Sequence, residues 1–136
     1  MAYGCTSLRN ITIPSKIKSI NTYSFSGCTS LSSVIYETSA LTAIGTYAFY
    51  NDYALRDLNV PDTVKSIGNY AFYYCYSTYA SALTLPSALT LLGTYAYQYC
   101  YNLKTLEIPS GLTVLGDYAF AGCRALSSII DHRLTA

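Results

Sequence analysis

Cysteine is the first residue type in this chain that could do chemistry, and it occurs five times in 136 residues. Structural zinc sites use close pairs of cysteines separated by two to four residues. Here at least 22 residues lie between consecutive cysteines, which are Cys5, Cys28, Cys75, Cys100 and Cys123. A free cysteine behaves as a small buried hydrophobe, so we expect these five to point into the core, with disulfides or a bound metal as the alternatives.

The titratable residues do not form a recognisable catalytic set. His132 is the one histidine, and it lies between Asp131 and Arg133 near the C-terminus, where we expect a solvated tail. The seven carboxylates fall at unrelated positions: Glu37, Asp52, Asp57, Asp62, Glu107, Asp117 and Asp131. A glycosidase would need two of them paired across a substrate, and no phosphate-binding glycine loop is present. The sequence therefore predicts no catalytic site, no cofactor and no metal.

Charge and hydropathy exclude two further classes of function. Charged residues make up 11% of the chain, against about 25% in typical proteins. The net charge of +1 provides no field for nucleic acid. No apolar run approaches the roughly 20 residues of a membrane helix, and residues 1–6 do not read as a signal peptide. We expect neither nucleic-acid binding nor membrane insertion.

An internal repeat dominates the sequence. An aromatic triplet recurs at intervals of 24, 23, 25 and 23 residues: Tyr23-Ser24-Phe25, Tyr47-Ala48-Phe49, Tyr70-Ala71-Phe72, Tyr95-Ala96-Tyr97 and Tyr118-Ala119-Phe120. Three residues after each triplet comes a cysteine, except in the second copy, which has Asp52. A leucine and two apolar pairs follow in register. This period and leucine spacing are typical of leucine-rich repeats, and the chain holds about five and a half repeats of 23–25 residues.

One repeat can be translated into a coil of backbone. Residues 55–60 alternate apolar and polar side chains, as a short strand should, and Pro61 ends it because proline cannot donate to a ladder. Residues 62–67 return on the opposite side, and Gly68 allows a tight bend. Residues 70–75 then form a turn or a single helical turn. Stacked coils bury the apolar face that one coil cannot bury alone, so the sequence predicts a β-rich solenoid as a single domain over residues 1–136.

The repeat resembles a known family. Residues 67–75 are similar to the IGxxAFxxC core of BspA-like leucine-rich repeats, and residues 103–109 are similar to the LxxLxIP strand of that family. Departures are Glu37 for proline, Asp52 for cysteine, Tyr97 for phenylalanine and a two-residue insertion near residues 77–82. The resemblance implies a curved solenoid of bacterial or protist surface proteins that binds proteins or mediates adhesion, and therefore an extracellular location.

Eight tyrosines depart from the repeat. They surround the cysteine slot of the three middle repeats: Tyr50, Tyr53, Tyr73, Tyr74, Tyr76, Tyr79, Tyr99 and Tyr101. Equivalent residues of adjacent coils stack, so we expect Tyr53, Tyr76 and Tyr101 to form one row, with the pairs Tyr50–Tyr73 and Tyr74–Tyr99 beside it. Tyrosine is enriched in interfaces because it combines apolar area with a polar hydroxyl. We predict that these tyrosines bind a partner, the alternative being that they merely cover the edge of a thin solenoid.

The strand face and the chain ends leave the function open between two classes. The side chains that the strands direct outward are a mixture of small, apolar and charged residues, and they do not indicate a particular ligand. Neither end, at Met1 or at Ala136, reads as a polar cap, although solenoids usually need caps. The chain is therefore either a segment of a longer protein or a subunit that stacks head to tail into a filament. We expect a non-enzymatic interaction or adhesion module, with the self-assembling subunit as the alternative.

Overall fold

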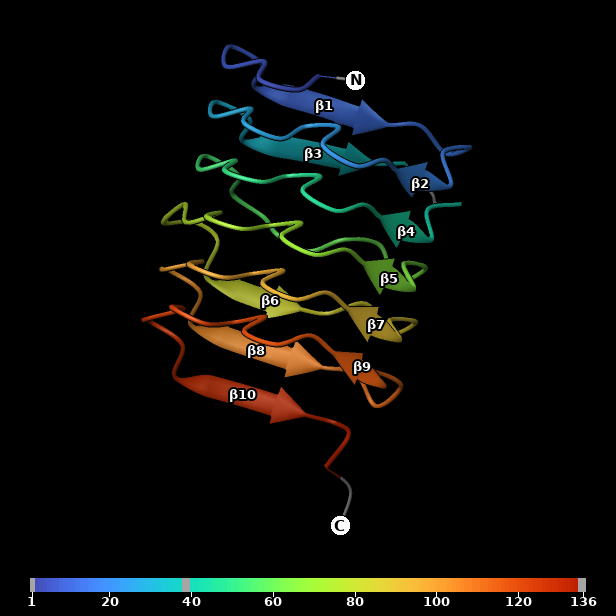
Figure 1. Ribbon diagram of the computed structural model, residues 1–136, viewed down its shortest axis with the longest axis vertical. Coiled ribbons are helices and arrows are strands. Elements are labelled where there is room, and N and C mark those ends of the chain that lie inside the picture. Colours follow the sequence, from blue (N-terminus) through green and yellow to red (C-terminus); the bar gives the residue numbers. More distant parts are fainter. Residues whose placement is uncertain (1, 38–39, 135–136) are drawn as a thin grey trace.

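The computed structural model describes residues 2–37 and 40–134, and the prediction about Met1 and Ala136 lies outside these residues. Ten short strands occur in the described part: β1 (Asn10–Ile13), β2 (Ser19–Ile20), β3 (Ser33–Tyr36), β4 (Ala43–Ile44), β5 (Ser66–Ile67), β6 (Ala82–Thr84), β7 (Leu91–Leu92), β8 (Thr105–Ile108), β9 (Val114–Leu115) and β10 (Ser128–Asp131). They lie in two columns, which the chain visits in turn as it winds from one coil to the next, except that no strand of the other column comes between β4 and β5 (Figure 1).

The two columns of strands form parallel sheets along the solenoid. Strands β2, β4, β5, β7 and β9 pair in that order in one five-stranded sheet, while β1 pairs with β3 and β8 lies between β6 and β10 in the other column. Each pairing joins equivalent residues of neighbouring coils, such as Ile67 with Leu92 and Leu106 with Ile129. The predicted β-rich leucine-rich-repeat solenoid is therefore confirmed.

The strand predicted at residues 55–60 is wrong. These residues form no strand, and the longer-stranded column is interrupted between β3 and β6. Asp57 Oδ1 accepts hydrogen bonds from Asn59 N at 2.9 Å and Asn59 Nδ2 at 2.8 Å, and Asn59 Oδ1 accepts from Thr84 N at 2.8 Å. Side-chain oxygens of Asp57 and Asn59 thus accept hydrogen bonds that backbone carbonyls would accept in a parallel sheet. Asp and Asn side chains often compete with the backbone for hydrogen bonds in this way. Leu58 still points inward and is buried.

The aromatic triplets lie in turns, and the described residues contain no helix, so the turn was the correct one of the two predicted forms. Glycine is needed at position 68, but not for the backbone freedom that the sequence analysis predicted. Gly68 has no left-handed φ; instead, a Cβ added there would lie 2.6 Å from Thr46 N of the preceding coil. This glycine allows the coils to approach, while the left-handed position of the same bend belongs to the first tyrosine of the triplet, as at Tyr47 and Tyr70, each with φ of 58°.

The core consists of ladders that run along the solenoid axis. The inner aromatic rings stack coil on coil with centroids 5.0–5.6 Å apart, through Phe25, Phe49, Phe72, Tyr97 and Phe120. Beside them, the thiol of Cys75 donates to the Phe49 carbonyl one coil before, and Cys100 and Cys123 repeat the contact.

Four of the cysteines are buried and free, as predicted, but Cys5 is exposed, which corrects the expectation for that residue. It lies on the first described coil, where no preceding described coil covers it.

Candidate functional site

The eight predicted tyrosines gather where each middle coil turns toward its strand. We call this set, Tyr50, Tyr53, Tyr73, Tyr74, Tyr76, Tyr79, Tyr99 and Tyr101, the tyrosine edge. The equivalent slots around Cys28 hold Ser26, Gly27 and Thr29, and those around Cys123 hold Ala121, Gly122 and Arg124. The aromatic density is therefore specific to the middle coils and is not a property of the repeat.

The predicted rows are present. Tyr53 stacks on Tyr76 with ring centroids 5.2 Å apart, and Tyr76 lies 5.6 Å from Tyr101 in a tilted arrangement. The Tyr50–Tyr73 and Tyr74–Tyr99 pairs stack at 4.9 and 4.8 Å. Edge-to-face contacts join the rows, the shortest between Tyr73 and Tyr74 at 4.7 Å. Such pairs each contribute about 0.5–1.5 kcal/mol beyond area burial, so the rings hold one another in place before any partner binds.

Tyr79 is the exception among the eight. It lies in the two-residue insertion, and its ring carries the guanidinium of Arg56 at 4.5 Å instead of another ring. It is also the most exposed member, at 66% of its surface. A second arginine, Arg124, lies 4.7 Å over the Tyr101 ring. Two rings of the tyrosine edge, Tyr79 and Tyr101, thus carry a cation stacked on an aromatic face.

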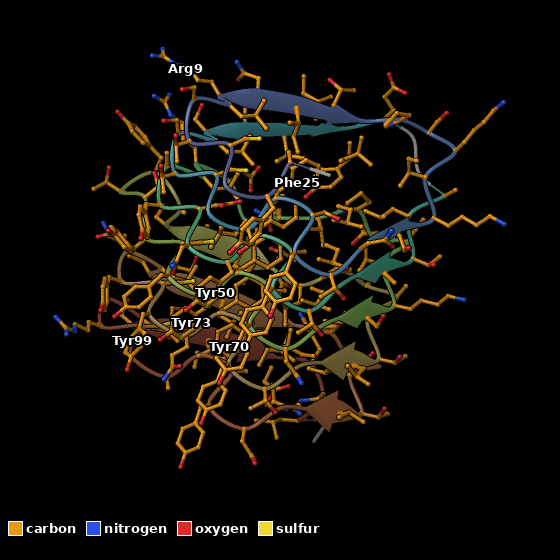
Figure 2. All side chains as sticks on the ribbon, turned by 45° about the horizontal axis from the view of Figure 1, so that its top comes forward. Arg9, Phe25, Tyr50, Tyr70, Tyr73 and Tyr99 are labelled. Atoms are coloured by element: carbon orange, nitrogen blue, oxygen red, sulfur yellow. The ribbon has the colours of Figure 1, made fainter. Side chains whose placement is uncertain are left out.

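Sequence reasoning missed the continuity of this surface with the tyrosines of the repeat. Tyr47 and Tyr70, which stack at 4.8 Å in the repeat ladder, contact Tyr50 and Tyr73 edge-to-face at 5.2 and 5.4 Å. Figure 2 shows Tyr50, Tyr70 and Tyr73 next to one another. The sequence did contain this information, because Tyr50 and Tyr73 each follow a ladder tyrosine by three residues and so lie on the same turn.

The tyrosine edge is shallow. Tyr53 is 36% exposed, and the remaining tyrosines apart from Tyr79 are half-buried. A hollow of about 150 Å³ lies among Tyr50, Asn51, Tyr53, Tyr74 and Tyr76. Sites for drug-sized ligands measure roughly 300–1,000 Å³. The hollow therefore fits one side chain of a partner rather than a separate small molecule.

Three middle-coil residues keep a backbone conformation that suits glycine. Asn51, Tyr74 and Tyr99 have φ of 61–62°, whereas Gly4, Gly27 and Gly122 fill the same slot of the outer coils with φ of 68–73°. A left-handed residue with a Cβ costs roughly 1–2 kcal/mol relative to the right-handed form. Tyr74 and Tyr99 thus occupy a backbone conformation that a residue with a Cβ disfavours. Residues held in disfavoured backbone conformations cluster at functional sites.

Three hydroxyls of the tyrosine edge have a raised pKa and are held in their neutral form. Burial among neighbouring rings raises the pKa of Tyr73 to about 12. Burial also raises the pKa of Tyr50, and a hydrogen bond with Tyr101 raises that of Tyr74. These groups offer a partner neutral O–H donors and acceptors above an apolar base.

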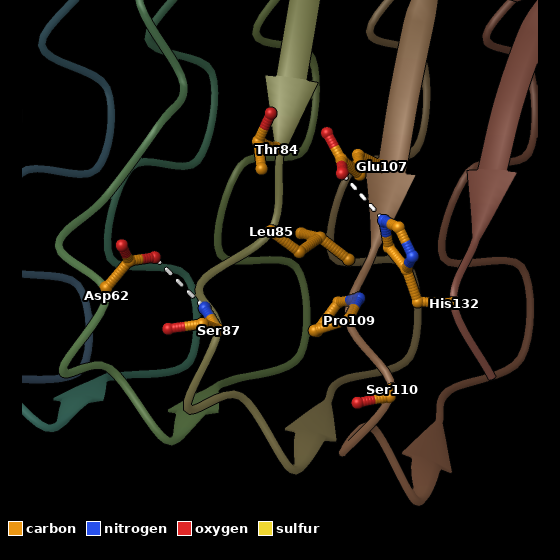
Figure 3. Close-up of a pocket in the computed structure, with 8 residues that line it drawn as sticks. All are labelled: Asp62, Thr84, Leu85, Ser87, Glu107, Pro109, Ser110 and His132. Carbon is orange, nitrogen blue, oxygen red and sulfur yellow. Dashed lines mark hydrogen bonds and ion pairs between the residues drawn. The ribbon is translucent and has the colours of Figure 1, made fainter.

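A second hollow, of about 500 Å³, lies at the ends of the longer strands and includes His132 (Figure 3). His132 is exposed, in keeping with the predicted solvated tail, but its Nε2 lies 2.7 Å from Glu107 Oε1. Asp62, on the other side of the hollow, accepts a hydrogen bond from Ser87 N at 3.0 Å. Sequence reasoning missed this grouping because its members come from coils about 25 residues apart.

The polar hollow offers little chemistry. Its serine and threonine hydroxyls make no hydrogen bond to His132 or to a carboxylate in the structure as described. A nucleophile and base would need such a contact. Residues 2–37 and 40–134 also hold no group of three or more His, Cys, Asp or Glu side chains suited to a metal ion. Within those same ranges there is no helix that could cross a bilayer.

Comparison with known proteins agrees with the geometry. The sequence model of the BspA type Leucine rich repeat region matches residues 2–127 in 6 copies. The leucine-rich-repeat protein TpLRR of T. pallidum is 29% identical, with a TM-score of 0.88 over 96% of this chain and 60% of that chain. The pneumococcal vaccine antigen PcpA is 23% identical, with a TM-score of 0.55 over 91% of this chain and 39% of that chain.

The chain thus spans about 60% of the length of the T. pallidum protein. A comparison with curated proteins found no match.

Proposed function

Because the chain belongs to the BspA-type leucine-rich-repeat family, we propose that it is a non-enzymatic protein-interaction module whose partner binds the tyrosine edge. The family and the solenoid fold support a binding role in general. The choice of surface is our own, and it rests on the residues that distinguish the middle coils from the outer ones.

The observation that carries the proposal is the replacement of small residues by tyrosine in the middle coils alone. A purely structural covering of the edge would be needed equally at Cys28 and Cys123, where the slots hold small residues or Arg124. Two of the tyrosines, Tyr74 and Tyr99, also occupy left-handed positions that glycine fills elsewhere. Residues that raise the energy of the free protein without a structural need are the expected signature of a binding surface.

The energetics of tyrosine suit this role. A few residues carry most of the binding energy of an interface, and tyrosine and arginine are enriched among them. The stacked rings are held in place by their neighbours, so a partner does not bear the entropy cost of ordering them. Arg56 and Arg124 contribute cations that are already oriented by Tyr79 and Tyr101.

We further propose a location at the cell surface and a role in adhesion. The resemblance of the repeat to surface proteins of bacteria and protists supports this location. A rigid solenoid that presents one aromatic edge would suit attachment to a protein on another surface.

Selection from a displayed random peptide library tests the proposed surface. The chain is immobilised, and bound clones are eluted with soluble wild-type protein or with the triple variant Tyr53→Ser, Tyr76→Ser and Tyr101→Ser. We expect wild-type protein to compete at least tenfold better than the triple variant, about 1.4 kcal/mol of binding free energy. A control variant with serine at Tyr3 and Tyr118, both 65% exposed and outside the tyrosine edge, should compete like wild type. Equal competition by a folded triple variant would refute the proposal.

Self-assembly through the ends is a second candidate, favoured by one observation. Leu115 and Ile129 are 38% and 56% exposed, whereas their partners Leu92 and Leu106, one coil before, are almost fully buried. A further coil would cover the exposed pair, and a second copy stacked head to tail would supply one. Light scattering over a concentration series, with negative-stain imaging, separates the candidates. Growth into fibres supports assembly, and a monomer at every concentration excludes it.

A further inference from the structure

A column of basic residues accompanies the tyrosine edge. One slot of the repeat alternates between a basic residue and serine: Arg9, Ser32, Arg56, Ser81, Lys104 and Ser127. It lies immediately before β1, β3, β6, β8 and β10, and Arg56 holds the same slot in the coil that has no strand there. Backbone hydrogen bonds join neighbouring members from Ser32 N to Arg9 O, from Arg56 N to Ser32 O and from Lys104 N to Ser81 O, whereas Ser81 N donates to Tyr79 O at the insertion. We call Arg9, Arg56 and Lys104 the basic column.

The cations of this column are available to a partner. All three are exposed, and none takes part in an ion pair within the described part of the chain. Arg56 lies over the Tyr79 ring, which leaves its edge N–H groups free to bind an anion. The adjacent carboxylate, Asp57, is engaged by the backbone and side-chain nitrogens of Asn59.

The distance between the cations of the basic column matches the repeat of a polyproline II helix. The members of the column sit two coils apart. In the coils that carry Arg56, Ser81 and Lys104, the ladder rings Tyr47, Tyr70 and Tyr95 stack with centroids 4.8 Å apart at each step, the spacing typical of neighbouring parallel strands, so Arg56 and Lys104 are separated by about 9.6 Å along the axis. A polyproline II helix rises about 3.1 Å per residue with three residues per turn, or about 9.3 Å per turn. An acidic residue at every third position would therefore meet one cation per turn.

The tyrosine edge supplies what a proline-rich chain needs. Proline-rich segments in the polyproline II conformation dock on aromatic-lined grooves, at a low cost in conformational entropy because the helix is already formed. The rows of Tyr53, Tyr76 and Tyr101 run along the same axis as the basic column. The hollow of about 150 Å³ beside Tyr53 and Tyr76 takes a single ring-sized side chain.

We infer that the partner segment is proline-rich and acidic, that it adopts the polyproline II conformation, and that it lies along the solenoid axis. Its prolines contact the tyrosine rows and its carboxylates pair with Arg56, Lys104 and, in a longer segment, Arg9. This inference rests on the proposed function and names the chemistry of the partner. A sulfated polysaccharide fits less well, because it carries several charges per repeat while the column offers one cation per two coils.

Calorimetric titration with synthetic peptides tests the inference on the whole chain. The probe is a peptide of five Glu-Pro-Pro repeats. Its controls are a Glu-Pro-Pro-Pro repeat, which breaks the spacing, and a Glu-Gly-Ser repeat, which keeps the spacing of charge but not the helix. We expect the Glu-Pro-Pro peptide to bind at least tenfold more tightly than either control, and to weaken as salt is raised.

Two charge variants locate the binding. Arg56→Gln with Lys104→Gln should weaken binding of the Glu-Pro-Pro peptide at least tenfold. Lys18→Gln with Lys65→Gln removes the same charge from the return side of the coils, next to β2 and β5, and should leave affinity unchanged. Equal effects of the two variants would mean that net charge alone matters, and would overturn the inference.

The remaining outcomes separate this inference from the proposed function. If library peptides bind the tyrosine edge but the Glu-Pro-Pro peptide does not, the inference is wrong and the proposed function stands. If no peptide of either kind binds there, both are wrong. Binding of a heparin fragment that depends on Arg56 and Lys104, without binding of the peptide, would likewise overturn the choice of partner.

Discussion

Asp52 fills a slot that cysteine occupies in the neighbouring coils. Its side chain is fully buried; Oδ1 accepts a hydrogen bond from Cys28 N at 2.9 Å, while Oδ2 has no partner among the described residues. Burial raises its pKa from 3.8 to about 8. At neutral pH the native protein therefore keeps this carboxyl protonated, while the unfolded chain ionises it.

The pH dependence of Asp52 has a definite sign. Its stabilising contribution is complete below pH 3.8, falls as the pH rises because the unfolded state loses its proton first, and is lost once the pH passes about 8. We expect Asp52→Cys to stabilise the protein by about 1–3 kcal/mol at pH 7, because it removes an unsatisfied buried polar atom. Urea unfolding at pH 5 and at pH 8 checks this. The variant's advantage should be larger at pH 8, and an advantage that shrinks would contradict the pKa assignment.

Tyr74 and Tyr73 are adjacent but have different backbone conformations. Tyr74 has φ of 61°, and Tyr73 is not among the left-handed residues. We therefore expect Tyr74→Gly to be more stable than Tyr74→Ala by about 1 kcal/mol. At Tyr73 the order should reverse, with alanine more stable than glycine by about 0.5–1 kcal/mol. Denaturant unfolding of the four variants measures both differences. If the same residue, glycine or alanine, gave the more stable protein at both positions, the left-handed backbone of Tyr74 would not be a source of strain.

At the scale of the coil, backbone approach sets the spacing on which every ladder depends. An added Cβ at Gly68, Gly93 or Gly116 would lie 2.3–2.6 Å from backbone atoms of the preceding coil. The stacked tyrosines, the cysteine column and the basic column all inherit their regular separation from this contact. The glycines thus determine the geometry of a surface that they do not touch.

Gly68→Ala tests that dependence. We expect a loss of about 1–3 kcal/mol in unfolding free energy, as for other overpacked sites, since Thr46 N would lie 2.6 Å from the new Cβ. Gly111→Ala is the matched control, because its nearest neighbour would be an ordinary 3.9 Å away; this change should be neutral or slightly stabilising. Thermal unfolding of both variants gives the comparison. A loss at Gly111 equal to that at Gly68 would mean that alanine is disfavoured in the turns for another reason.

Part of this organisation could be predicted from the sequence, for a physical reason. Residues in equivalent slots of a solenoid must stack, so the period alone was enough to predict the Tyr53–Tyr76–Tyr101 row and the buried cysteines. Local side-chain chemistry was not visible in the period. The Asp57–Asn59 contacts that replace a strand and the pairing of His132 with Glu107 both depend on rotamers of single residues.

At the scale of the whole solenoid, the described coils present one aromatic edge. The tyrosine edge lies midway along the axis, away from Leu115 and Ile129, whose exposure favours contacts at one end. Binding along the edge and stacking at the ends would therefore use separate surfaces.

The central claim is that a partner covers the tyrosine edge, and chemical protection of tyrosines measures this directly. The chain, free or saturated with a library-selected peptide, is treated briefly with a tyrosine-nitrating reagent, and modification is quantified residue by residue by mass spectrometry. We predict that the peptide protects Tyr53, Tyr76, Tyr79 and Tyr101, while the exposed Tyr3 and Tyr118 are modified equally in both samples. Protection of Tyr3 or Tyr118 with no change along the tyrosine edge would contradict the account.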